Sequence, residues 1–71
     1  MKIYVLLKQA YDENKRTVCV SEDIHKIRTS ICEKLDANYD YPTFEIWENG
    51  ELLSRTCGSN VLKRIADEIK E

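Results

Sequence analysis

The feature that most constrains the fold is the run Ile3-Tyr4-Val5-Leu6-Leu7, which is apolar at every position. Successive side chains of a β-strand point to opposite faces of the sheet, so a strand with this sequence is apolar on both faces. A strand of this kind belongs inside a sheet rather than at its edge. The sequence therefore predicts a central strand over residues 2–9.

The next two elements are predicted from local patterns. The β-branched run from Thr17 to Val20 predicts a short second strand. Ser21 then resembles a helix N-cap, because Glu22 and Asp23 would follow it in the first turn. The helix itself is indicated by four apolar residues at spacings of three, four and four: Ile24, Ile27, Ile31 and Leu35.

The second half of the chain repeats this plan. Asn49-Gly50 stands between strand-like runs at 43–48 and 51–54, and both residues tolerate the positive φ of a type I′ turn. A two-residue turn would pair Glu48 with Glu51, Trp47 with Leu52, and Ile46 with Leu53. A last helix capped by Ser59 would turn five apolar residues inward: Val61, Leu62, Ile65, Ala66 and Ile69.

These elements predict a single α+β domain over residues 1–71 with the order ββαββα. The expected sheet is antiparallel and four-stranded, with strand order 2-1-3-4 and both helices on one face. A right-handed crossover from strand 2 past strand 1 to strand 3 permits this arrangement. It also places the doubly apolar first strand inside the sheet.

The face of the sheet away from the helices is the first candidate contact surface. We expect Ile3, Val5 and Leu7 to face the helices, which turns Tyr4 and Leu6 outward. On the second hairpin Phe44, Ile46 and Leu53 form the better core set, so Trp47 and Leu52 would point outward as well. Four large apolar side chains on one exposed face predict an interface.

The second candidate is the hairpin itself. Between Asp36 and Glu51 the chain carries five acidic residues, no lysine or arginine, and four of its six aromatic residues. Such a stretch suits recognition of a basic protein partner, although the acids also serve solubility. The predicted interaction surface consists of Tyr4, Leu6, Glu45, Trp47, Glu48, Glu51 and Leu52.

Reactive groups are sparse. The lone histidine, His25, is interpreted as a partly exposed residue at a helix end. Two glycines provide no phosphate-binding loop, and neither the histidine nor the cysteines have metal-ligand spacing. We therefore predict no catalytic residue, no metal and no cofactor. The alternative is a thiol-dependent enzyme or redox-sensitive protein that uses Cys57 at the start of the last helix.

The remaining expectations concern partners and location. Three cysteines without a signal-like leader predict reduced thiols and a cytoplasmic protein, and the apolar run at 3–7 is too short for a membrane span. A net charge of −2 gives no general attraction to nucleic acid. Single-stranded nucleic-acid binding through Tyr4 and Trp47 is thus a distant alternative. The sequence favours a small interaction module that binds a protein partner or itself, as a homodimer.

Overall fold

The order of elements along the chain is the one predicted from the sequence. The computed structural model describes residues 1–10, 14–36 and 39–70. Its elements are β1 (Lys2–Ala10), β2 (Arg16–Ser21), α1 (Ile24–Lys34), β3 (Asp40–Glu48), β4 (Glu51–Cys57), the 3-10 turn η1 (Gly58–Asn60) and α2 (Val61–Lys70). The strands form one antiparallel sheet in the order β2-β1-β3-β4. The predicted ββαββα architecture is confirmed.

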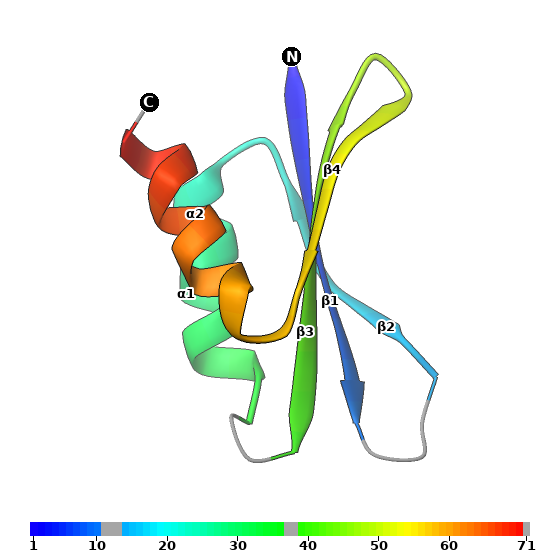
Figure 1. Cartoon of the computed structure of the whole chain (residues 1–71), viewed down its shortest axis with the longest axis vertical. Coiled ribbons are helices and arrows are strands. Elements are labelled where there is room, and N and C mark those ends of the chain that lie inside the picture. Colours follow the sequence, from blue (N-terminus) through cyan, green and yellow to red (C-terminus); the bar gives the residue numbers. More distant parts are fainter. Residues whose placement is uncertain (11–13, 37–38, 71) are drawn as a thin grey trace.

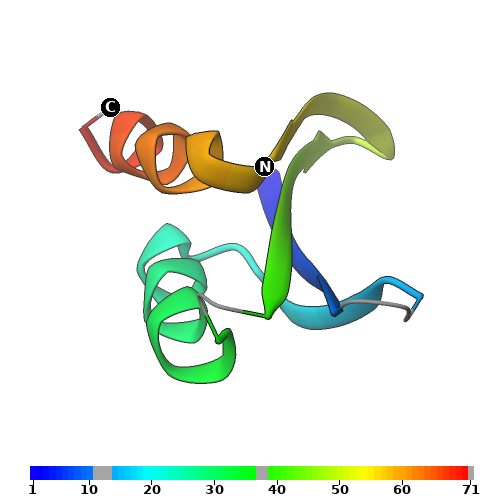
Figure 2. The same ribbon diagram turned by 60° about the horizontal axis from the view of Figure 1, so that its bottom comes forward.

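The sheet and the two helices form two layers (Figure 1). Both helices lie on one side of the sheet, and the tip of the β3–β4 hairpin reaches toward the other side (Figure 2). β1 and β3 lie at the centre and pair along their whole length, from Lys2 opposite Glu48 to Ala10 opposite Asp40. The doubly apolar strand is therefore interior, as its composition requires.

The face that β1 turns toward the helices is the reverse of the predicted one. Tyr4 and Leu6 are buried, at 8% and 0% exposure, and belong to the core. The prediction that these two side chains point outward is wrong. The reason is the register: Tyr4 lies opposite Ile46 and Leu6 opposite Phe44, and directly opposed residues share a face.

The core is built around this register. The Tyr4 ring stacks on Phe44 with 5.9 Å between centroids, and Ile27 of α1 and Ile65 of α2 close the core from the helix layer. The hydroxyl of Tyr4 donates to Glu68 Oε1 at 3.0 Å. A tyrosine fits this inward position because its hydroxyl finds a buried acceptor on α2.

Both edge strands contain one extra residue relative to their inner neighbours. In β2 this residue is Val18, and in β4 it is Leu53. The bulge in β4 pairs Ile46 with Ser54, so the predicted Ile46–Leu53 pair is wrong, and Leu53 is exposed rather than in the core. The turn and the Trp47–Leu52 pair are confirmed, since Asn49 and Gly50 both have positive φ.

The apolar stripe of α1 faces the core as predicted, with Ile27 fully buried. Its N-cap is Asp23 rather than Ser21, because the Asp23 carboxylate accepts the backbone N–H of His25 at 2.9 Å. In α2 the prediction is wrong in part. Val61, Ile65 and Ile69 face the core, but Leu62 and Ala66 are exposed, and Glu68 is buried.

The two glycines allow a test of local strain. Gly50 and Gly58 have φ of 79° and 69°, a region that costs an L-residue about 1–2 kcal/mol. A Cβ at Gly50 meets nothing within 4 Å, whereas one at Gly58 would lie 2.9 Å from the Tyr41 hydroxyl. In urea unfolding, Gly58→Ala should therefore be more destabilising than Gly50→Ala. In a Tyr41→Ser background, Gly58→Ala should lose this extra destabilisation, whereas the effect of Gly50→Ala should stay the same. Equal losses of unfolding free energy for the two glycine variants would contradict a close contact between a Cβ at position 58 and Tyr41.

Candidate interaction surface

The sheet face turned away from the helices carries apolar side chains from all four strands. Ile3 lies opposite Trp47, which lies opposite Leu52, and Val5 lies opposite Val20, so the register places these side chains on one face. We call this surface the open face and define it by eight residues: Ile3, Val5, Leu7, Val20, Glu45, Trp47, Leu52 and Arg55. Neither helix covers it (Figure 2).

Much of this apolar surface is accessible to solvent. Val20 is 59% exposed, Ile3 40% and Leu52 38%, while Val5 and Trp47 are half-buried. These side chains are contiguous across the sheet because they are direct cross-strand neighbours. A contiguous apolar area of this kind marks an interaction site more often than a scatter of single exposed residues does.

An ion pair lies in the middle of the open face. Glu45 Oε2 accepts the Nε–H of Arg55 at 2.8 Å, and Glu45 Oε1 accepts the indole N–H of Trp47 at 3.1 Å. Glu45 is only 9% exposed, and both its carboxylate oxygens are engaged, which a charge at low exposure requires. The network also holds the Trp47 ring in one orientation on the face.

The acidic stretch of the second hairpin is largely balanced by cations from elsewhere in the chain. Besides the Glu45–Arg55 pair, Asp40 Oδ2 lies 3.8 Å from Lys8 Nζ, and Glu48 Oε2 lies 3.6 Å from the amino group of Met1. Glu51 is exposed at the hairpin end. The sequence shows five unopposed acids, but folding brings three cations to them.

The structure thus brings together only part of the predicted interaction surface. Glu45, Trp47 and Leu52 lie on the open face, whereas Tyr4 and Leu6 lie beneath it in the core. Glu48 and Glu51 lie at the hairpin end and not within the apolar area.

Five residues of the open face were missed by the sequence analysis: Ile3, Val5, Leu7, Val20 and Arg55. A signal for them was present in α2, where Glu68 continues the inward stripe of Val61 and Ile65. A glutamate in an inward stripe needs polar partners on the facing strand, and in β1 Lys2 and Tyr4, which share one face, both donate to it.

The cysteines are free thiols in three different settings. Cys19 packs against the core, whereas Cys32 is exposed on α1. Cys57 is half-buried and its Sγ lies 3.7 Å from the Thr43 hydroxyl. It precedes a three-residue 3-10 turn rather than an α-helix, which weakens the argument for an activated thiolate.

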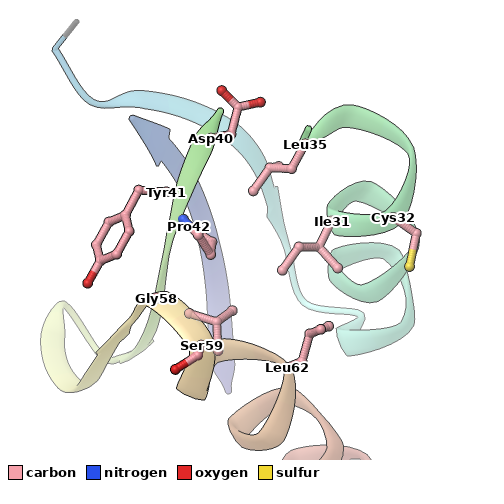
Figure 3. A pocket seen from close by; sticks show the side chains of 10 residues that line it. Ile31, Cys32, Leu35, Asp40, Tyr41, Pro42, Gly58, Ser59 and Leu62 are labelled. Carbon is pink, nitrogen blue, oxygen red and sulfur yellow. The ribbon is translucent and has the colours of Figure 1, made fainter. Parts of the chain in front are cut away.

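A concave region lies on the helix side of the molecule, apart from the open face. It is a groove of about 600 Å³, and side chains from the end of α1, the start of β3 and the η1–α2 junction converge on it (Figure 3). Its apolar lining includes Ile31, Leu35, Pro42 and Leu62. The carboxylate at its rim, Asp40, already accepts the Asp36 backbone N–H at 2.9 Å. The groove offers mainly apolar contacts, and the polar side chains of its lining include Asp40, Tyr41 and Ser59.

Two further findings concern the described residues only. No helix in this part of the chain is both long and apolar enough to cross a membrane. Within the same residues, no group of three or more histidine, cysteine, aspartate and glutamate side chains is placed to hold a metal ion. The best-defined candidate site is the open face, which gathers apolar side chains from four strands.

Comparisons with protein-family models, curated proteins and solved structures found no match to this chain. The function is accordingly argued from the geometry of the open face.

Proposed function

We propose that this chain is a non-catalytic protein-interaction module whose contact surface is the open face. The observation that carries the proposal is the apolar area that spans all four strands on the side that neither helix covers. Its partner presents a largely apolar protein surface with balanced charge, because the only charges within the open face are the paired Glu45 and Arg55. A cytoplasmic location is part of the proposal and fits the three free thiols.

The supporting features match the anatomy of known interfaces. Aromatic residues and arginine are enriched in such surfaces, and the open face contains Trp47 of β3 and Arg55 of β4. The Trp47 ring is held by its bond to Glu45, so little side-chain entropy is lost when a partner covers it. A basic partner has less support than the sequence implies, because cations within the chain balance Asp40, Glu45 and Glu48.

The alternatives have less structural support. The nucleic-acid hypothesis used Tyr4 and Trp47 as two stacking platforms, but Tyr4 is buried against Phe44. The thiol hypothesis used Cys57 at a helix N-terminus, and the residue lies at a 3-10 turn beside Thr43. Neither arrangement adds an observation that favours the hypothesis.

Site-specific photo-crosslinking in the producing cell tests the proposed function. A photoreactive phenylalanine analogue is placed at Val20 or Leu52 on the open face, and at Leu62 on α2 as a control. Leu62 is 58% exposed and matches Val20 at 59%, so the control differs in position and not in accessibility. We expect protein adducts from Val20 and Leu52 and none from Leu62.

The pattern of adducts decides the outcome. Adducts from the open face that disappear when Trp47 is changed to serine support the proposal. Equal adducts from all three positions would indicate nonspecific contact and contradict it. The absence of any adduct from Val20 and Leu52 would also contradict it.

A further inference from the structure

We infer that the partner of the open face is a second copy of this chain, so that two sheets pack face to face in a twofold-symmetric dimer. This inference rests on the proposed function of the open face and names its occupant. Three features of the structure favour self-association: the charge pattern of the face, its area and the shape of the sheet edges.

The charge pattern is self-complementary. Glu45 and Arg55 lie side by side across β3 and β4, with a 2.8 Å contact between them. A twofold axis that passes between the two side chains places the guanidinium of one copy over the carboxylate of the other. The Arg55 side chain is 52% exposed, so it is accessible for this second contact. The dimer would therefore bury no uncompensated charge at this position.

The area of the face agrees with a small dimer interface. Strands of six to nine residues, about 4.8 Å apart, give the sheet a planar footprint of about 500 Å². Its accessible surface is larger because side chains stand above the plane. Specific interfaces bury about 600–1,000 Å² per partner, so a dimer through this face lies at the lower end of the range. We expect a dissociation constant in the micromolar range rather than the nanomolar range.

The edges of the sheet favour face-to-face packing over growth of the sheet. Both edge strands are short and contain a bulge, at Val18 in β2 and at Leu53 in β4. Bulges interrupt the row of backbone groups that another strand would pair with. The sheet face itself is therefore the extended surface that is left for contact with another copy.

Sedimentation of the purified chain from about 1 µM to about 1 mM tests this inference over the range in which such a dimer dissociates. We expect the mass to rise toward twice 8.3 kDa with concentration. Trp47 emission should shift to the blue over the same range, because the indole leaves water. Val20→Glu with Leu52→Glu should weaken the dimer by about 100-fold or more, since each copy then buries two unpaired carboxylates. The matched control Leu62→Glu should leave the dissociation constant within about twofold.

The wild-type data decide the inference even if the double variant fails to fold. A chain that stays monomeric throughout, or one that dimerises without a change in Trp47 emission, overturns it. A stronger effect of Leu62→Glu than of the open-face changes would place the contact at the helices and also overturn it. A monomer that still gives open-face photo-adducts with another protein in the cell overturns the dimer but leaves the proposed function standing. A chain that is monomeric and gives no open-face adducts would overturn both the dimer and the proposed function.

Discussion

Replacing Leu6 with alanine should lower the free energy of unfolding by about 2–5 kcal/mol, whereas Leu7→Ala should lower it by about 1 kcal/mol. Leu6 is fully buried between the sheet and the helices, and its neighbour Leu7 lies half-buried on the open face. A domain of 71 residues has a total stability of about 4–10 kcal/mol. The first change therefore removes a large share of the stability, and the second removes a small share.

Urea unfolding followed by circular dichroism, at a concentration at which the chain is monomeric, measures both values. The two variants delete the same atoms from adjacent positions of one strand, so each is the control for the other. If Leu6→Ala is too unstable to give a folded baseline, Leu6→Val should still be more destabilising than Leu7→Val. A larger loss at Leu7 would mean that β1 turns its other face to the helices, and it would remove the open face as described.

The second large effect is expected at Glu68, the buried carboxylate of α2. Its side chain is 2% exposed and accepts three hydrogen bonds: from Lys2 Nζ at 2.8 Å, from the Tyr4 hydroxyl at 3.0 Å and from Arg64 Nη1 at 3.0 Å. Glu68→Gln keeps the size of the side chain but loses its charge. At neutral pH it should lower the free energy of unfolding by about 1–3 kcal/mol.

The same residue should give the stability a defined dependence on pH. Burial acts to raise the pKa of Glu68, but the hydrogen bonds from Lys2 and Tyr4, the charge of Lys2 and the hydrogen bond from Arg64 together outweigh it. The pKa in the folded chain is therefore below its ordinary value. The contribution of the carboxylate is fully present above the unfolded pKa of about 4.3 and is lost as the pH falls through the lower folded pKa.

Unfolding of the wild type and of Glu68→Gln between pH 7 and pH 2.5 tests whether the stabilisation by Glu68 is lost on acidification. The difference in unfolding free energy between them should be constant from pH 7 to about pH 5 and should shrink below about pH 4.3. Asp67→Asn, an exposed acid adjacent to Glu68 in α2, should show no comparable loss of stability at neutral pH. A difference that grows on acidification would show that the folded chain holds Glu68 protonated, contrary to the network.

The sequence predicted the part of the candidate site that lies on the β3–β4 hairpin but not the part that lies on β1. Trp47 and Leu52 follow from Asn49-Gly50, because a two-residue turn fixes their pairing within a few residues of the chain. The cations that balance the hairpin acids come from β1 and from the far side of the β4 bulge: Lys8 lies in β1, Met1 directly precedes it, and Arg55 follows the bulge. The local sequence contains no signal for those contacts.

By itself the sequence determined the element order, the central place of β1, the type I′ turn and the inward stripe of α1. Each of these follows from short-range periodicity or from the backbone preference of one or two residues. Only the tertiary structure decided which face of β1 meets the helices, because all five residues from Ile3 to Leu7 are apolar and either face would bury well. The register between β1 and β3 decides which face is buried, because it places Tyr4 and Leu6 opposite Ile46 and Phe44. The same register brings the Tyr4 hydroxyl to Glu68 and leaves the aliphatic face of β1 uncovered by the helices.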